Sequence, residues 1–294
     1  MFASFFFKNG CGKQKGKNEI EIRYNVEAFL NLQQECRVVL EYDEKGKKKA
    51  MKIIIVRHAE PDYEIDSLTE KGWREAELLS KRLAKLDIDQ IFVSPLGRAK
   101  DTCSFTEKVI GKKAGENEWL REFLSHKHED MVLAGERPAV WDQIPNEWTM
   151  DSRYFNEKEW HQTPYMKKWK VEEENKWVAS EFDNLLKEYG YEREGHYYRV
   201  RKANEKTIVL FCHFGLEVIL LSHLMSVSPM ILWHGFCAAP SSVTIINSEE
   251  RREGIASFRA SQIGDISHLY VAEEEPSFAA RFCEMYQNID QRHD

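Results

Sequence analysis

The sequence predicts an α/β fold built around a mostly parallel central sheet. Residues 53–56 are four β-branched residues in succession, a pattern typical of a strand buried on both faces of such a sheet. Residues 207–212 repeat this apolar pattern far along the chain, and segments with helical periodicity lie between the two. A chain of 294 residues is long enough for one large α/β domain or two small ones.

Both predicted core strands run directly into a histidine. Arg57 and His58 follow the first strand, and His213 follows the second. Because open α/β sheets bind ligands at the carboxyl ends of their strands, we expect these side chains to share one site. Arginine has a planar fork that suits phosphate or carboxylate, and histidine can act as a nucleophile or proton carrier near neutral pH.

A third basic side chain is expected at a strand-to-helix turn. Thr69 is the predicted N-cap of an amphipathic helix that continues to about Leu86. Residues 90–93 then form a short strand, and the next helix begins around Arg98. This position would combine the guanidinium group with the amide donors of a helix N-terminus, an arrangement that favours anions.

The stretch from about 123 to 206 differs from the rest of the chain, because tryptophans, tyrosines and prolines crowd into it. We expect it to form a cap over the site, with most of its aromatic side chains in the cap's own core. It should end in a helix that reaches about Tyr189, followed by a hairpin over residues 189–200. The strand over 207–212, a buried helix over 216–225, strands over 242–247 and 255–259 and a closing helix over 278–289 complete the prediction.

Composition limits the possible partners and locations. The chain carries a net charge of −7 and has a pI of about 5.9, which argues against a general nucleic-acid or membrane-surface binder. Its cysteines are scattered without a CxxC spacing, which indicates reduced thiols in a cytoplasmic protein. They are Cys11, Cys36, Cys103, Cys212, Cys237 and Cys283. No run reaches the apolar length of a membrane span, and residues 1–7 lack the basic start of a signal peptide.

Residues 1–50 form charged stretches around a modest apolar middle. We interpret them as an N-terminal extension without a catalytic role, although residues 20–24 and 37–42 could pair as a small hairpin. Met51, directly ahead of the first core strand, is a reasonable natural start.

Six short motifs occur in a fixed order between Met51 and about Leu269. They are Arg57-His58-Ala59-Glu60, Leu68-Thr69-Glu70-Lys71-Gly72, Ser94-Pro95-Leu96-Gly97-Arg98-Ala99-Lys100-Asp101-Thr102, Leu120-Arg121-Glu122, His213-Phe214-Gly215 and the closing Gly264-Asp265 to His268-Leu269. Together they resemble the motifs of the histidine phosphatase superfamily, with the phosphoglycerate mutase-like fold, and of its phosphatase branch. The resemblance implies a three-layer α/β/α fold, with the domain over residues 51–294 and a cap inserted at about 123–206.

The resemblance also implies a mechanism. A neutral His58 would attack the phosphorus of a small phosphate monoester and form a phosphohistidine. Arg57, Arg98 and His213 would bind the non-bridging oxygens and stabilise the transition state. Glu122 would protonate the leaving alcohol and then take a proton from the hydrolytic water. No metal or cofactor is required, because the arginines and His213 supply the positive charge.

Several departures leave alternatives open. Ala59 and Phe214 replace glycines of the family motifs, and Glu122 lacks the Gly-x-x-Glu-Gly sequence around the family's acid, so Glu60 or a cap carboxylate could act in its place. The segment after Glu60 lacks the longer stretch of true mutases, which favours hydrolysis over mutase-type phosphoryl transfer. A non-catalytic phospholigand-binding protein is the other alternative.

Two further points concern ligands. His126 and His128 could suggest a metal site, but a lone HxH in a loop is more often solvated. The aromatic and acidic cap favours a small phosphorylated metabolite over a polyanion. Phosphoglycerate, a sugar phosphate, a nucleotide and a cobalamin-pathway intermediate all remain open as the substrate, and the protein could be a homodimer.

Overall fold

The computed structural model describes residues 50–135, 139–277 and 287. The chain separates into two units between Lys47 and Lys48, and only the second contains described residues. The interpretation of residues 1–50 as a non-catalytic extension and the predicted helix over 278–289 therefore fall almost wholly outside the described part of the chain.

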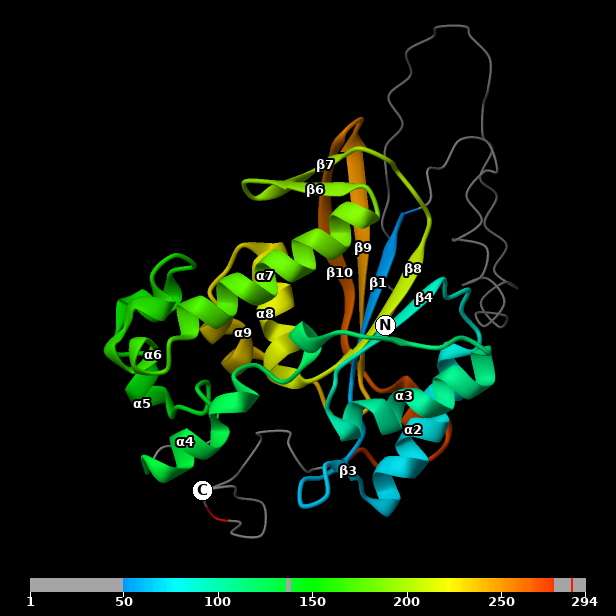
Figure 1. The fold of residues 1–294 in the computed structure, drawn as a ribbon, viewed down its shortest axis with the longest axis horizontal. Coiled ribbons are helices and arrows are strands. Elements are labelled where there is room, and N and C mark those ends of the chain that lie inside the picture. The colour runs from blue at the N-terminus through cyan, green and yellow to red at the C-terminus, as the bar shows by residue number, and fades with distance from the viewer. Residues whose placement is uncertain (1–49, 136–138, 278–286, 288–294) are drawn as a thin grey trace, which may run out of the picture. The chain divides into compact units, whose positions relative to one another are not determined.

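A central sheet organises the described unit (Figure 1). Its eight strands lie in the order β5-β4-β8-β1-β9-β10-β7-β6. The first four pair in parallel and the rest continue antiparallel, so all but β9 and β7 run in one direction. Their bounds are β1 Lys52–Arg57, β4 Gln90–Val93, β5 Gly115–Glu116, β6 Tyr191–Glu194, β7 Tyr197–Val200, β8 Thr207–Cys212, β9 Val243–Arg252 and β10 Ile255–Asp265.

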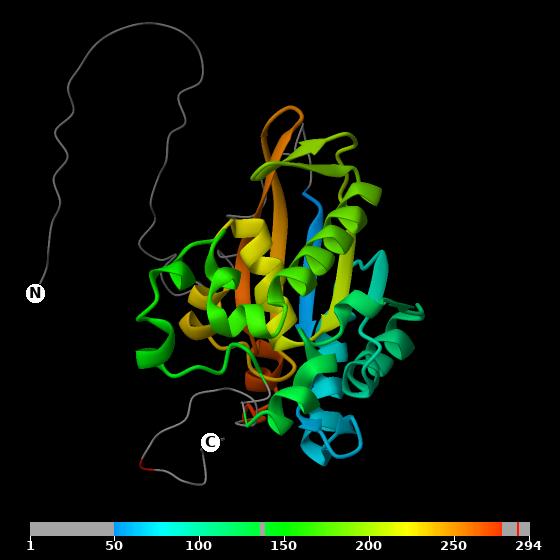
Figure 2. The same ribbon diagram turned by 60° about the vertical axis from the view of Figure 1, so that its left-hand side comes forward.

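Helices cover both faces of this sheet, which gives three layers (Figures 1 and 2). The side chains of β1 alternate between them: Ile53 and Ile55 join one buried cluster, whereas Ile54 and Val56 join another. Helices α2 (Glu70–Leu83) and α3 (Gly97–Ile110) supply the second cluster, and α7 (Val171–Glu188) and α8 (Phe214–Met225) supply the first. The prediction of an α/β/α fold with a mostly parallel sheet is confirmed.

Most predicted elements occur where the local signals placed them. Thr69 caps α2, because its hydroxyl accepts a hydrogen bond from the amide of Gly72 at 3.0 Å. The predicted hairpin forms from β6 and β7, and Gly195 takes the positive φ of 61° that its turn requires. The strand over residues 207–212 is β8, and it is buried along its whole length.

The bounds differ in a few places. β9 and β10 run beyond the predicted ends, because their polar ends pair with each other: Arg259 of β10 lies 2.8 Å from Glu249 of β9. The predicted loop after Glu60 contains a two-strand hairpin of β2 (Pro61–Asp62) and β3 (Ser67–Leu68). Each of these strands has only two residues, which is too short to show an alternating apolar pattern, so sequence periodicity misses the hairpin.

The segment between β5 and β6 consists mainly of short helices and ends in α7 (Figure 2). The short helices are α4 His128–Leu133, α5 Pro145–Trp148 and α6 Pro164–Lys168, with single 3-10 turns around them. Trp141, Trp160 and Trp169 are buried, and Trp141 stacks on Trp233 of α9 (Pro229–Gly235) with ring centroids 5.4 Å apart. We refer to this segment as the cap. Among the described helices, none has both the length and the apolar character to cross a membrane.

Candidate active site

The ends of β1 and β8 bring the two strand-end histidines together. Arg57 pairs with Cys212 in the parallel ladder, and the amide of His58 donates to the carbonyl of Cys212 at 3.0 Å. His58 and His213 therefore follow neighbouring strand ends, and their ring centroids lie 5.1 Å apart. Both side chains are buried.

The tautomer of His58 follows from its contact with the backbone. Nδ1 lies 2.8 Å from the carbonyl oxygen of Ala59, and because a carbonyl only accepts, Nδ1 carries the proton. The lone pair of the neutral ring is then on Nε2. Burial, together with the charges of Arg98 and Arg57, holds the pKa of His58 well below its usual range. A neutral ring with a free Nε2 lone pair is the form that a nucleophile needs.

The two arginines lie beside these rings on different elements. Arg57 at the end of β1 donates to the carbonyl of Ala238, and its guanidinium lies 5.3 Å from the centre of the Phe214 ring. Arg98 is in the first turn of α3 and is 8% exposed. Two guanidinium groups beside a neutral imidazole form a positively charged surrounding that suits an anion.

The start of α3 differs from the sequence prediction in one respect. The amide of Gly97 donates to Asp66 Oδ2 at 2.6 Å, and the amide of Leu96 donates to Ser94 Oγ at 3.2 Å. These two donors, expected to be available to an anion, are occupied by side chains of the protein. Arg98 Nη1 also lies 2.5 Å from Asp66 Oδ1.

Glu122 packs against the start of α8. Its Oε1 accepts from the amides of Phe123 at 2.8 Å and Leu216 at 3.0 Å, and its Oε2 accepts from Gly215 at 3.3 Å. Burial raises the pKa of Glu122, although these amides and the charges of Arg98 and Arg57 act in the opposite direction. Gly215 is needed here, because a Cβ would lie 2.2 Å from the Trp141 ring and 2.7 Å from Glu122 Oε1.

His213 is oriented by Ser94 at the end of β4. The Ser94 hydroxyl lies 2.7 Å from Nε2, whereas Nδ1 is buried without a hydrogen-bond partner in the described part of the chain. Burial and the charges of Arg98, His58 and Arg57 hold the pKa of His213 well below its usual range. When Ser94 donates to Nε2, Nδ1 carries the proton and is a donor for a ligand.

With this geometry established, the chain was compared with known proteins. Residues 53–184 match the family model described as histidine phosphatase superfamily, branch 1. This part of the chain is similar to that superfamily. No curated protein matches the sequence.

Two of the solved structures that the chain resembles are named as phosphatases. The mycobacterial glucosyl-3-phosphoglycerate phosphatase has a TM-score of 0.50 and 18% identity, over 74% of this chain and 100% of its own. The phosphoserine phosphatase of Entamoeba histolytica, solved with 3-phosphoglyceric acid, has a TM-score of 0.47 and 20% identity, over 74% and 99%. Because the identity is low, the similarity to the glucosyl-3-phosphoglycerate phosphatase shows a shared histidine phosphatase fold and nothing more.

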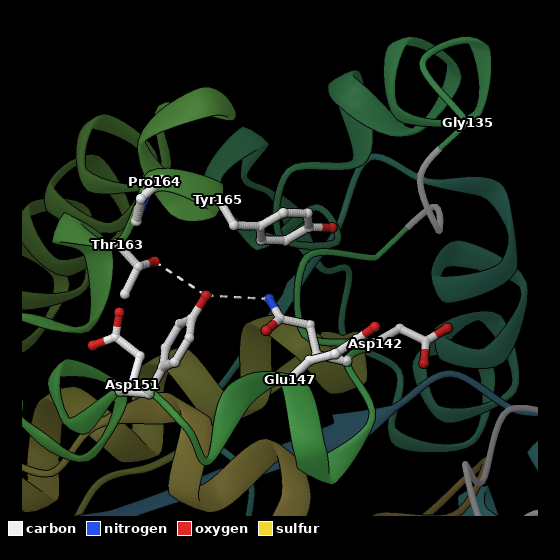
Figure 3. A pocket seen from close by; sticks show the side chains of 9 residues that line it. Gly135, Asp142, Glu147, Asp151, Thr163, Pro164 and Tyr165 are labelled. Carbon is white, nitrogen blue, oxygen red and sulfur yellow. Dashed lines mark hydrogen bonds between the residues drawn. The ribbon is translucent and has the colours of Figure 1, made fainter.

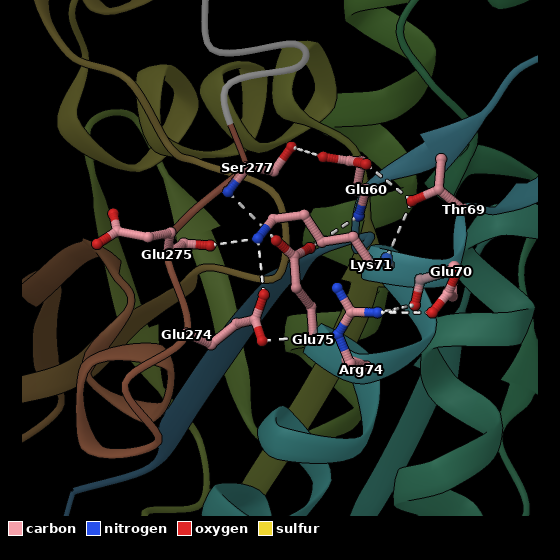
Figure 4. Close-up of polar contacts among 10 residues, drawn as sticks. Glu60, Thr69, Glu70, Lys71, Arg74, Glu75, Glu274, Glu275 and Ser277 are labelled. Carbon is pink, nitrogen blue, oxygen red and sulfur yellow. Dashed lines mark hydrogen bonds and ion pairs between the residues drawn. The ribbon is translucent and has the colours of Figure 1, made fainter.

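Glu60 takes part in a separate network with Thr69, Glu75 and Ser277 (Figure 4). Its carboxylate accepts from the hydroxyls of Thr69 at 2.8 Å and Ser277, and its amide donates to Glu75 Oε2 at 2.9 Å. Both carboxylate oxygens of Glu60 thus have partners that hold them beside α2. This arrangement favours Glu122 over Glu60 as the acid.

The His126 and His128 pair does not form a metal site with other described residues, since no group of three or more possible ligands lies together in the ranges given above. The Nδ1 atom of His126 lies 3.0 Å from Arg121. His128 is close enough to the site for the charge of Arg98 to depress its pKa, and it in turn affects His213. The HxH spacing does not distinguish the two histidines, whereas the folded cap gives them different surroundings.

Three further residues, Thr102, Ser94 and Asp66, support the basic side chains of the candidate site. The Thr102 hydroxyl accepts from the amide of Ala59 at 2.9 Å and donates to the carbonyl of Arg98 at 2.7 Å, so it joins the two basic segments. Ser94 orients His213, as described above. Ser94 and Thr102 could be found from the sequence, because both lie in the motif over residues 94–102. Asp66 lies in none of the motifs.

A second cavity lies within the cap and has a different character (Figure 3). It has a volume of about 550 Å³, and its described lining includes the carboxylates of Asp142, Glu147 and Asp151. The Tyr154 hydroxyl accepts from Thr163 Oγ1 at 3.1 Å and from Gln143 Nε2 at 3.5 Å. No lysine or arginine is among the described lining residues, so this cavity does not suit a phosphate group.

Proposed function

We propose that this protein is a metal-independent phosphatase that hydrolyses a small phosphate monoester through a phosphohistidine on His58. The observation that carries the proposal is the hydrogen bond from His58 Nδ1 to the Ala59 carbonyl, which leaves the Nε2 lone pair free. In the proposed reaction, Nε2 attacks phosphorus in line and the bond to the leaving oxygen breaks.

Arg57, Arg98 and His213 would bind the non-bridging oxygens. The two guanidinium groups supply fixed positive charge, and His213 Nδ1 is buried without a described partner and can donate a hydrogen bond. These groups would counter the negative charge of the phosphoryl group without a metal ion. Metal independence is therefore part of the proposal and is tested with a chelator below.

Glu122 would act as the general acid and then as the general base. Burial raises its pKa, which favours the protonated form required for donation to the leaving alcohol. After the alcohol departs, the carboxylate would take a proton from the water that attacks the phosphohistidine. Its three amide contacts would stabilise the carboxylate between these steps.

A small phosphorylated metabolite is the proposed substrate class, because the described cap covers the sheet edge with aromatic and acidic residues. The cytoplasm is the proposed location. The buried free thiols of Cys103 and Cys212 support a reducing compartment.

The deciding experiment measures hydrolysis of p-nitrophenyl phosphate in the presence of EDTA by the wild type and by His58→Ala. We expect turnover by the wild type and none by the variant. Rapid acid-free quenching with ³²P-labelled substrate should trap an acid-labile, alkali-stable phosphoenzyme in the wild type alone. Turnover that requires an added divalent ion, or that persists in His58→Ala, would contradict the proposal.

A further inference from the structure

Three buried nitrogen atoms around the site have no hydrogen-bond partner among the described residues. They are Nε of Arg98, Nδ1 of His213 and Nε2 of His128. The first two come from α3 and the end of β8, whereas the third comes from α4 in the cap. A buried polar group without a partner costs free energy, so each of these three nitrogen atoms would gain from a hydrogen bond to a bound ligand.

The three groups are near enough to interact. The charge of Arg98 lowers the pKa values of both His128 and His213, and the charge of His128 also lowers the pKa of His213. His126 provides the contrast: the charged groups that affect it are Glu174, Arg121, Lys127 and Asp130, none of which is in the site.

The chain path explains how His128 reaches the site. Glu122 and Leu124 start two successive tight turns, in which the amides of Ser125 and Lys127 donate to their carbonyls at 2.9 Å and 2.8 Å. Leu124 takes a positive φ of 58° at this reversal. The turns bring the His128 ring back to the backbone of Phe123, directly beside Glu122. His128 is thus tied to the same short segment as the proposed acid.

An anion is the ligand that suits this arrangement. The guanidinium of Arg98 and Nδ1 of His213 can donate to oxygen, and a phosphoryl group carries three non-bridging oxygens. His128 can donate from Nε2 as an imidazolium, because its other ring nitrogen contacts the backbone of Phe123. Burial and the neighbouring positive charge lower the pKa of His128 to about 4 in the absence of a ligand. A bound dianion would compensate the charge of Arg98 and favour a proton on the ring.

We propose that His128 of the cap is an additional ligand of the substrate's phosphoryl group, with Nε2 donating to a non-bridging oxygen. This inference rests on the proposed function, because it places the phosphoryl group at the same site. It also gives the cap a role in binding, since the phosphoryl group would join α4 to the ends of β1 and β8.

The test compares binding of inorganic phosphate to the full-length protein by isothermal titration calorimetry, with EDTA present. His128→Leu keeps most of the side-chain volume without a hydrogen-bonding group, and His128→Gln supplies an amide donor near the position of Nε2. We expect the leucine variant to bind phosphate about 10- to 100-fold more weakly, as for loss of a hydrogen bond to a charged group. The glutamine variant should recover much of this loss.

His126→Leu is the matched control, because it removes a histidine two residues away that contacts Arg121. It should bind phosphate as the wild type does. Equal affinity of the wild type and His128→Leu would overturn the inference, and so would the same loss in His126→Leu, which would indicate a general disturbance of the segment. The thermal unfolding temperature of each variant, compared with that of the wild type, identifies a loss of phosphate affinity that is caused by misfolding.

Hydrolysis assays on the same samples separate the two proposals. If the wild type binds phosphate but hydrolyses no monoester, the proposed function fails, and the binding comparison still decides the role of His128. If hydrolysis is normal and KM is unchanged in His128→Leu, the proposed function holds and the role of His128 fails. A wild type that does not bind phosphate overturns both.

Discussion

Asp66 Oδ1 lies 2.5 Å from Arg98 Nη1, and Asp66 Oδ2 accepts from the amide of Gly97 at 2.6 Å. One carboxylate therefore holds both the guanidinium group and the backbone at the start of α3. The other basic residues of the site are fixed differently: Arg57 contacts a backbone carbonyl, and His213 contacts a serine hydroxyl. Asp66 is thus a positioning residue for the proposed phosphate-binding arginine.

We predict that Asp66→Ala raises KM for p-nitrophenyl phosphate about tenfold, with a smaller change in kcat. The loss of the carboxylate frees the arginine side chain, whose ordering would then have to accompany substrate binding. Steady-state kinetics measures both constants. Glu70→Ala is the control, because its partner Arg74 is half-exposed and remote from the chemistry. A lower KM in Asp66→Ala would show instead that the carboxylate competes with phosphate.

A second prediction concerns the glycine next to Arg98. A Cβ at Gly97 would lie 2.0 Å from the backbone carbonyl oxygen of Asp66, so the loop that carries this carboxylate would have to move. We expect Gly97→Ala to lower the free energy of unfolding by about 1–3 kcal/mol, as for overpacking, and to reduce kcat/KM. Urea unfolding measures the first effect and steady-state kinetics the second.

Gly235→Ala is the matched control for this change. A Cβ there meets nothing within 4 Å, and its φ lies outside the positive range. This variant should keep wild-type activity and stability within about 0.5 kcal/mol. If Gly97→Ala behaves in the same way as Gly235→Ala, the close approach of the Asp66 loop has no role in positioning Arg98.

If Glu122 is the general acid, the effect of its substitution on kcat should depend on the leaving group of the substrate. Glu122→Gln keeps the shape of the side chain but cannot donate a proton, so kcat should fall about 10²- to 10⁴-fold for an alkyl phosphate. p-Nitrophenolate leaves without a proton, and its release from the enzyme should be affected much less. A burst of p-nitrophenol in pre-steady-state kinetics measures that step. Equal losses for both substrates would contradict the role of Glu122 as the acid.

The central strands of the sheet could be predicted from short stretches of sequence, because each depends on a few neighbouring residues. The same holds for four basic residues at or near the ends of these strands, which are Arg57, His58, Arg98 and His213. β1 and β8 are continuous apolar strands that end at Arg57 and Cys212, and the register between them follows from the parallel pairing. The α2 cap at Thr69 and the strand before Ser94 also depend on a few neighbouring residues. Motif spacing then related these pieces to one family.

The parts that sequence reasoning missed depend on packing between distant segments. Asp66 reaches Arg98 only because a two-strand hairpin folds over the start of α3. His128 reaches the site only because a left-handed residue, Leu124, reverses the chain after Glu122. Asp66 has no periodic pattern and no motif position, and the HxH spacing of His128 suggested a metal ligand instead of a phosphate ligand.

A last prediction concerns the buried carboxylate of Glu217 in α8, which is 1% exposed and accepts from the Thr244 hydroxyl. Burial raises the pKa of Glu217 from 4.5 to about 7, against the effects of Thr244 and Arg57. The folded state therefore binds this proton more tightly than the unfolded state does. Its contribution to stability is greatest below about pH 4.5 and is lost as the pH rises through 7.

We predict that Glu217→Gln, which cannot ionise, stabilises the protein at pH 8 by up to about 3 kcal/mol relative to the wild type. At pH 5 the two proteins should differ little, because the wild-type side chain is then mostly protonated when folded. Urea unfolding at the two pH values measures this, and the difference between the proteins removes the shared contribution of Glu75, whose pKa burial also raises to about 7. A difference that is the same at both pH values would show that Glu217 does not titrate in this window. The sign would reverse if ionised Glu217 stabilises Arg57 by more than its burial costs.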